Sequence, residues 1–217
     1  MDGLLIDSER FMWKISMKKA CANQNIPMND ELHSRLMGMS ENRVKEILKK
    51  EFGPEFDYKK YRADMNESNS EIAEKGTIPL MKGTRELMDY CHENDIKMAI
   101  ATTTRHEQAL KILNRIGIDQ EFDFLVGGDE VEKGKPAPDI FLKALDHFGY
   151  EKNEALVFED GHSGARAAIS SGMRLVLVPD LAALSDEDLT QAYRVLNRID
   201  EIIEDIKNEN FKSSMIV

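Results

Sequence analysis

The chain has 217 residues, of which 41% are apolar and 32% are charged, as in soluble globular proteins rather than disordered ones. Its formal net charge of −11 excludes nucleic acids and anionic membranes as principal partners, because both require a basic surface. The sequence shows no signal peptide and no apolar run of transmembrane length. Two cysteines, Cys21 and Cys91, give neither a disulfide framework nor a metal motif, so we expect a cytoplasmic protein.

The first residues have the pattern of a loop that follows a buried strand, Met1-Asp2-Gly3-Leu4-Leu5-Ile6-Asp7-Ser8. No apolar strand precedes this loop, although in a parallel sheet such a strand would be central. Each unpaired buried backbone group costs about 1 to 3 kcal/mol, against about 5 to 15 kcal/mol for the stability of a whole domain. We therefore expect a sheet that lacks its first strand, and interpret the sequence as an N-terminally truncated form.

Residues 9–78 carry apolar residues at helical spacing and no run with the alternation of a strand. The pattern predicts a small bundle of four helices, with glycines at their ends. The expected helices cover Phe11 to Ala20, Asp30 to Met37, Ser40 to Leu48 and Tyr58 to Glu74.

After Pro79, helical segments alternate with short apolar runs. Such alternation predicts an α/β fold, a Rossmann-like doubly wound parallel sheet with helices on both faces. The expected strands are Lys97 to Ala101, Phe122 to Val126, Ala155 to Phe158 and Arg174 to Val178. We expect residues 1–8 and 79–217 to form this core, with its first strand truncated, and residues 9–78 to form an inserted helical cap domain.

Three polar motifs accompany the expected strands. In an open parallel sheet, ligands bind outside the carboxyl ends of the strands, so their chemistry should converge on one edge. The motifs are Ile100-Ala101-Thr102-Thr103-Thr104-Arg105, Gly134-Lys135-Pro136-Ala137-Pro138-Asp139 and Val157-Phe158-Glu159-Asp160-Gly161.

Thr102 ends an apolar strand and begins a run of hydroxyl residues that leads into a helix. Backbone N–H groups at a helix start, with a hydroxyl beside them, can hold phosphate, so we predict phosphate binding by Thr102 with Thr103 in a secondary role. The alternative is that Thr103 or Thr104 caps the helix. Lys135 precedes a rigid proline turn and can hold a fixed ammonium against phosphate; its alternative is a solvated surface lysine.

Glu159 and Asp160 are adjacent acids at the end of a strand, where they repel each other unless a cation or a lysine joins them. Oxygen ligands beside a phosphate favour Mg²⁺, which takes one or two protein carboxylates and keeps several waters. The pattern therefore predicts a magnesium site at these acids.

The four motifs, in this order, resemble the haloacid dehalogenase superfamily, in the helical-cap subgroup that is similar to beta-phosphoglucomutase and related phosphatases. The resemblance implies that Asp2 is the general acid and base and binds the metal through its backbone carbonyl, and that Lys135 is catalytic. Asp160 would bind the metal, and Glu159 would hold Lys135 or belong to the metal site. The nucleophilic aspartate of the family would stand immediately before Met1. The alternative for Asp2 is an exposed residue at a frayed terminus.

The cap is expected to select the substrate. Mutases of this subgroup carry an arginine after a Gly-x-Ser turn, whereas here Glu41 follows Gly38-Met39-Ser40, and Arg43 is a possible substitute. We therefore predict a Mg²⁺-dependent phosphatase of small phosphorylated metabolites, acting as a monomer through an aspartyl-phosphate. The alternatives are a sugar-phosphate mutase and a truncated, catalytically inactive protein that binds phosphate and metal.

Overall fold

The computed structural model describes residues 1–36, 41–75, 78–181, 184–208 and 215–217. The chain forms two compact units: a core unit, Met1–Ile6 with Leu80–Val217, and a cap unit, Asp7–Pro79. The core unit's chain is interrupted after Ile6 and resumes at Leu80, and these two residues form an antiparallel bridge. Among the described residues, no helix combines the length and apolar character needed to cross a membrane.

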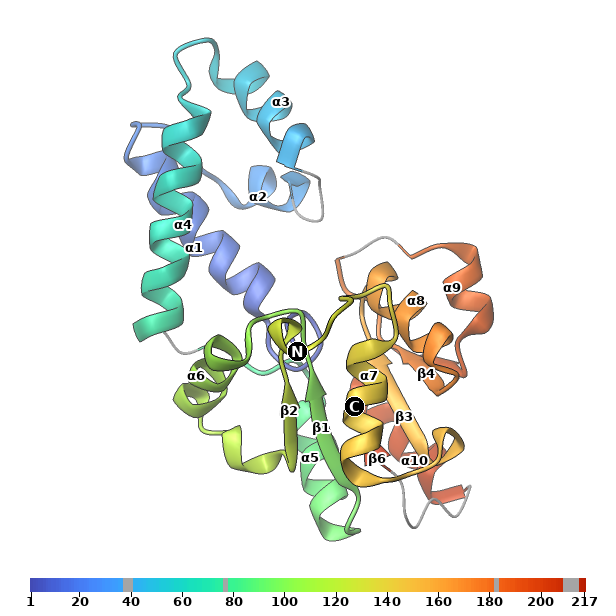
Figure 1. Cartoon of the computed structure of the whole chain (residues 1–217). Coiled ribbons are helices and arrows are strands. Elements are labelled where there is room, and N and C mark those ends of the chain that lie inside the picture. Colours follow the sequence, from blue (N-terminus) through green and yellow to red (C-terminus); the bar gives the residue numbers. More distant parts are fainter. Residues whose placement is uncertain (37–40, 76–77, 182–183, 209–214) are drawn as a thin grey trace. The chain divides into compact units, whose positions relative to one another are not determined.

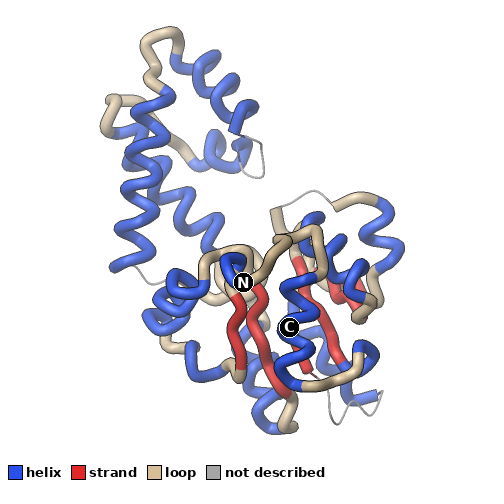
Figure 2. The backbone as a smooth tube through the Cα atoms, in the orientation of Figure 1, coloured by secondary structure: helices blue, strands red, loops and turns tan. Residues whose placement is uncertain are grey.

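The described part of the cap unit consists of helices and their connections (Figure 2). Its helices are α1 (Ser8–Ala22), α2 (Asp30–Leu36), α3 (Glu41–Phe52) and α4 (Tyr58–Lys75). Helices α1 and α4 lie side by side and bury a shared apolar interior that includes Met17, Cys21 and Tyr61. At one point along this contact, the Ser16 hydroxyl donates a hydrogen bond of 2.5 Å to Asn69.

The core unit contains a six-stranded parallel sheet in the order β2-β1-β6-β3-β4-β5. Its strands are β1 (Lys97–Ala101), β2 (Phe124–Val126), β3 (Ala155–Glu159), β4 (Arg174–Leu177), β5 (Arg194–Val195) and β6 (Met215–Ile216). Its α-helices are α5 (Thr84–Glu93), α6 (His106–Ile116), α7 (Asp139–Phe148), α8 (His162–Ser171), α9 (Asp186–Gln191) and α10 (Ile202–Asn208). Short 3₁₀ turns cover Asp119–Glu121, Gly128–Glu130, Lys152–Glu154 and Ile199–Glu201.

The two faces of the sheet are covered by different helices. Helices α7 and α8 pack against one face, where alternate residues such as Ala99, Ala101 and Val157 share their apolar core. Helix α5 packs against β1 and against the 3₁₀ turn that precedes α10 (Figure 1). These features confirm the predicted α/β class with a parallel sheet. The strand expected at 122–126 begins two residues later, because a turn of 3₁₀ helix occupies 119–121.

The central position of the sheet is filled from the C-terminus, which corrects the expectation of an incomplete ladder. Strand β6 lies between β1 and β3 and is parallel to both. Beyond it, the Val217 N–H donates to the Leu156 carbonyl at 2.9 Å, and the Phe158 N–H donates to the Val217 carbonyl at 3.0 Å. Met215, Ile216 and Val217 are all buried. The sequence pattern missed β6 because two or three apolar residues carry no measurable periodicity.

Strand β6 does not span the full length of its neighbours. A cavity of about 40 Å³ remains in the core unit, lined by side chains that include Met1, Met88, Ile100, Phe158 and Val217. The three C-terminal residues therefore complete the hydrogen-bonded sheet but fill its centre only in part.

Deletion of residues 215–217 should destabilise the core unit selectively. Each large apolar side chain removed from the core costs about 1.5 to 3 kcal/mol, and the inner edges of β1 and β3 lose their partners. The two cysteines report on the units separately, since Cys91 lies in α5 and Cys21 in α1, and both are buried. Burial raises the pKa of Cys91 to about 12 and that of Cys21 to about 11, so both thiols are protonated and slow to react at neutral pH.

In single-cysteine variants, the deletion should accelerate maleimide labelling of Cys91 by at least about tenfold and leave Cys21 labelling unchanged within about twofold. The matched control is Ile216→Val, which keeps the strand and removes one methyl group. Equal labelling of Cys91 in the full-length and shortened chains would show that β6 contributes nothing to the stability of the sheet.

Candidate active site

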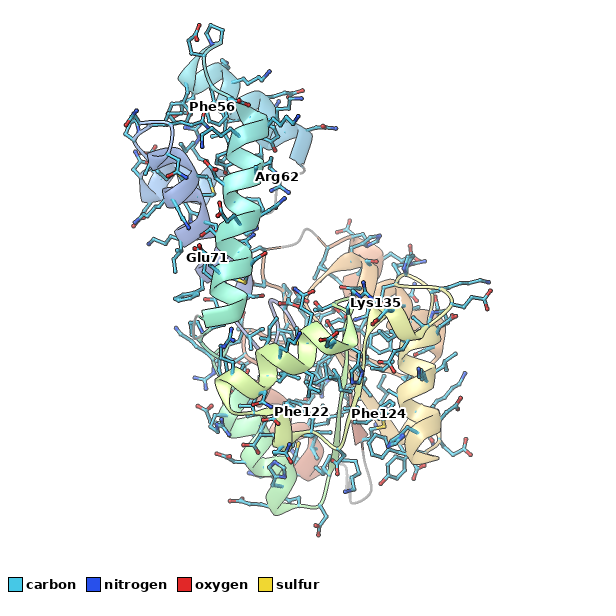
Figure 3. The ribbon with its side chains drawn as sticks, turned by 60° about the vertical axis from the view of Figure 1, so that its left-hand side comes forward. Phe56, Arg62, Glu71, Phe122, Phe124 and Lys135 are labelled. Atoms are coloured by element: carbon cyan, nitrogen blue, oxygen red, sulfur yellow. The ribbon has the colours of Figure 1, made fainter. Side chains whose placement is uncertain are left out.

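A buried ion pair joins two strand ends of the core sheet. The Lys135 Nζ lies 2.5 Å from Glu159 Oε1 and donates a 3.1 Å hydrogen bond to the carbonyl of Ala101. Both charged side chains are only 9% exposed. Because Ala101 ends β1 and Glu159 ends β3, these contacts hold the ammonium at the carboxyl edge of the sheet, near the top of the core unit in Figure 3. Lys135 is thus not the solvated surface lysine of the alternative interpretation.

A glycine of α8 makes room for the Glu159 carboxylate. A methyl group placed on Gly164 would overlap the carboxylate atoms of Glu159. Helix α8 therefore approaches the end of β3 as closely as it does because position 164 has no side chain. This constraint was not visible in the sequence, where Gly164 is one helical residue among several.

The carboxylate of Asp160 packs against the turn that contains Asp2. Gly3 has a φ of +72°, and a Cβ added there would stand 2.5 Å from Asp160 Oδ2. The turn is closed by hydrogen bonds from the Gly3 N–H to the Ile6 carbonyl at 3.0 Å and from the Ile6 N–H to the Met1 carbonyl at 3.2 Å. Asp2 is therefore held in a defined turn and is not frayed.

Thr104 is a contact of Asp2 that the sequence placed in a minor role. Its hydroxyl donates a 3.1 Å hydrogen bond to Asp2 Oδ2, and its N–H donates to the Thr102 hydroxyl at 3.2 Å. Thr102 is 3% exposed, and its N–H donates a hydrogen bond to the carbonyl of Val126 at the end of β2. The hydroxyl run after β1 is consequently linked to the Asp2 turn, although the two segments are about a hundred residues apart in sequence.

The helix-cap alternative for the threonines is wrong. Helix α6 begins at His106, and its N-cap residue is Arg105. The first N–H of the helix, from His106, donates instead to Asp129 Oδ1 at 2.8 Å. Thr103 and Thr104 are thus left in the loop between β1 and α6, where ligands of parallel sheets bind.

The oxygen atoms near Asp2 are of the kind that binds Mg²⁺. Asp160 offers a carboxylate oxygen beside the turn of Asp2, whose backbone carbonyl is the second expected ligand, and Mg²⁺ takes one or two carboxylates with other oxygen atoms and water completing its shell. No cluster of three or more His, Cys, Asp or Glu side chains suited to a metal occurs in the described residues. Glu159 was also expected at the metal, but one of its oxygens is held by Lys135 and the other accepts the Asp160 N–H at 3.3 Å. Glu159 therefore holds Lys135, and its expected part in the metal site stays a prediction.

The sequence gave no indication of a second pair near Asp160. The Nδ1 atom of His162, the first residue of α8, lies 2.5 Å from Oδ2 of the fully buried Asp188. Burial would raise the pKa of Asp188, but hydrogen bonds from His162 and Ser185 outweigh it and hold that pKa below its usual range. The pair joins α8 to α9. A histidine two residues after an acid pair was visible in the sequence, whereas its partner 26 residues later was not.

Comparison with known proteins identifies the family of this chain. Residues 1–178 match the family of haloacid dehalogenase-like hydrolases. The chain belongs to this family. The "Phosphorylated carbohydrates phosphatase" of Thermotoga maritima is 30% identical over 176 residues, 81% of each chain. A "Probable pseudouridine-5'-phosphatase" of Drosophila melanogaster is 31% identical over 217 residues, covering 97% of this chain and 90% of the relative. The crystal structure of a putative beta-phosphoglucomutase from Thermotoga maritima superposes with a TM-score of 0.75, at 29% identity over 96% of each chain.

Membership of the haloacid dehalogenase-like hydrolases confirms the resemblance that the four motifs indicated. The matched range ends at residue 178, just after β4. Strands β5 and β6 lie beyond it. The segment that fills the centre of the sheet is thus outside the part of the chain that matches the family.

The cap residues expected to select the substrate are only partly described. Arg43 is exposed on α3, and its guanidinium lies 3.0 Å from Glu46 Oε2. The Gly38-Met39-Ser40 turn and the side chain of Glu41 lie outside the described residues. The roles of Glu41 and Arg43 therefore stay predictions.

Gly164→Ala should destabilise the protein although it replaces glycine by the best helix former. In an open helix the change would stabilise by up to about 1 kcal/mol. Here the new methyl group displaces Glu159 from Lys135, and breaking a buried ion pair costs about 3 to 5 kcal/mol. Urea unfolding measures the difference in free energy. Gly134→Ala is the matched control, because a Cβ at Gly134 meets no atom within 4 Å. A stabilised Gly164→Ala variant would mean that Glu159 does not need this space.

Proposed function

We propose that the protein is a Mg²⁺-dependent phosphatase of small phosphorylated metabolites. The observation that carries the proposal is the buried Lys135–Glu159 pair, which fixes an ammonium at the sheet edge close to the threonine loop. A preorganised cation in a dry position stabilises phosphoryl charge far better than a mobile surface lysine. The names of the two similar phosphatases support the reaction class.

Each residue of the edge has a distinct role in this proposal. Thr102 and Thr103 would bind the phosphate oxygens through hydroxyl and backbone groups of their loop, and Lys135 would offset the repulsion between phosphate and nucleophile. Asp2 would donate a proton to the leaving oxygen and later accept one from water. Thr104, through its 3.1 Å hydrogen bond, orients the Asp2 carboxylate for both steps.

The Asp2 backbone carbonyl and the Asp160 carboxylate would hold the magnesium ion, which when bound would neutralise charge on the phosphoryl oxygens. An aspartyl-phosphate route also needs a nucleophile, and the motif places that aspartate immediately before Met1. We propose that turnover by this route requires an apolar strand and an aspartate at that position. A chain without them would retain phosphate and metal binding without turnover.

Hydrolysis is favoured over the mutase alternative by the chemistry of the cap. A mutase must hold a second phosphate, and the candidate cation Arg43 is already paired with Glu46. The acid Glu41 stands in the sequence where mutases carry arginine. A phosphoryl group formed on the enzyme is therefore expected to pass to water.

Extension of the chain tests the proposed nucleophile. An apolar strand ending in aspartate, fused ahead of Met1, should raise hydrolysis of an aryl phosphate by several orders of magnitude, because covalent catalysis depends on that group. The matched control ends the same extension in asparagine. The extension must also displace β6, so the buried residues 215–217 should become accessible to carboxypeptidase in both extended proteins. Equal turnover by the aspartate and asparagine versions would contradict the proposed match of Asp2 to the second aspartate of the family motif.

The metal assignment predicts different effects for the two neighbouring acids. Asp160→Asn should weaken Mg²⁺ binding by at least about tenfold, measured by calorimetry on the purified chain, because a neutral amide replaces a charged ligand. Glu159→Gln should leave Mg²⁺ affinity within about threefold and reduce turnover of the extended enzyme, since it loosens Lys135. Unchanged Mg²⁺ affinity in Asp160→Asn would remove Asp160 from the metal site.

A further inference from the structure

The cap unit contains a basic pocket that shares no residue with the site at the sheet edge. It is a cavity of about 460 Å³ between α3 and the start of α4. Lys45 and Lys49 line it from α3, one helical turn apart, and Lys59 and Arg62 line it from α4. Figure 3 labels Arg62 on α4, with Phe56 just before that helix. The volume lies within the usual range for pockets that hold small ligands.

The charge of this pocket contrasts with that of the protein. Four basic side chains and a single carboxylate, that of Asp57, line it, whereas the whole chain has a net charge of −11. One Asp57 oxygen already accepts the Lys60 N–H at 3.0 Å, as a cap of α4. The cap unit has equal numbers of acidic and basic residues, so the positive charge is concentrated locally. Concentrated charge of this kind attracts anions.

The pocket lysines also differ from other cations of the cap unit in their partners. Several of those lie within ion-pair distance of carboxylates, namely Lys14, Lys19, Arg35, Arg43 and Lys60. Within the part of the chain that the structure describes, Lys45, Lys49 and Lys59 form no ion pair, and the Lys45 Nζ lies instead 5.7 Å from the Tyr58 ring centroid. Like charges one turn apart on a helix are unfavourable. A bound anion would convert this repulsion into attraction.

The aromatic residues of the pocket favour an anion without a large ring. Phe56 and Tyr58 are 4% and 8% exposed, and their rings pack against each other with centroids 6.4 Å apart. Phe56 also packs on Tyr61, with centroids 5.6 Å apart. These rings form a packed wall and leave little exposed face on which a nucleobase could stack.

We propose that this pocket binds a small oligophosphate anion with three or more negative charges. Lys45, Lys49 and Lys59 would each donate charge-assisted hydrogen bonds to phosphoryl oxygens, with the Arg62 guanidinium at the wall on the α4 side. A concave site of this size suits a compact oligophosphate better than an extended acidic peptide, which would cover a flatter surface.

Calorimetric titration with inorganic tripolyphosphate at physiological salt tests the proposal on the full chain. Lys49→Gln should weaken binding by about tenfold, the loss expected for one charge-assisted hydrogen bond. Lys60→Gln is the matched control: Lys60 is adjacent to Lys59 in sequence, points to Asp64 at 2.8 Å and does not line the pocket. Its affinity should stay within about twofold of the parent chain.

Three outcomes would overturn the proposal. Equal weakening by Lys49→Gln and Lys60→Gln would show diffuse attraction with no pocket. Binding that is lost in Lys135→Ala and unaffected by Lys49→Gln would place the ligand in the core unit. Binding of an acidic peptide without binding of tripolyphosphate would make the pocket a protein contact.

Discussion

Filling the place between β1 and β3 is the constraint on which the core unit depends. Both strands have a central edge whose backbone groups must be hydrogen-bonded, and both end in residues of the candidate site. Only three residues, those of β6 and Val217, supply these hydrogen bonds in the described part of the chain. Ala101 and Glu159 can face each other across Lys135 because the strands that carry them are held at a fixed separation.

The geometry of the site also depends on two glycines, because a side chain at either position would occupy the space of a carboxylate. Gly3 allows the carboxylate of Asp160 to reach the Asp2 turn, and Gly164 allows that of Glu159 to lie under α8. Two adjacent acids are thereby given different tasks. Glu159 is neutralised by Lys135, and the carboxylate of Asp160 lies against the turn that contains Asp2. The two acids have different partners, which reduces the like-charge repulsion that the sequence predicts.

The division of charge between the two units has a functional consequence. The core unit carries the acidic excess of the chain, although its proposed substrate is itself an anion. Lys135 therefore has to overcome a repulsive field at short range, where its buried position strengthens its interaction with an anion. The cap unit is balanced overall, but its basic side chains near Tyr58 are gathered on one surface. An anion that reaches the cap unit meets less opposition.

The sequence by itself determined the fold class, the helical cap and the residues of the edge. These follow from periodicity and from polar groups placed directly after apolar runs, which are local properties of the chain. The pattern divided the helical segment from the alternating one within two residues of the boundaries of the two units. It also drew attention to Lys135, whose proline turn is contiguous in sequence.

Only the tertiary structure decided how those residues are used. That β6 fills the centre of the sheet, that Thr104 contacts Asp2 and that Asp188 pairs with His162 are contacts between distant segments. None has a periodic or contiguous signal, since each depends on how packed strands and helices bring loops together. The same reason separates Glu159 from Asp160: their neighbours in space, and not their neighbours in the chain, bring one to a lysine and the other to the turn that contains Asp2 and Gly3.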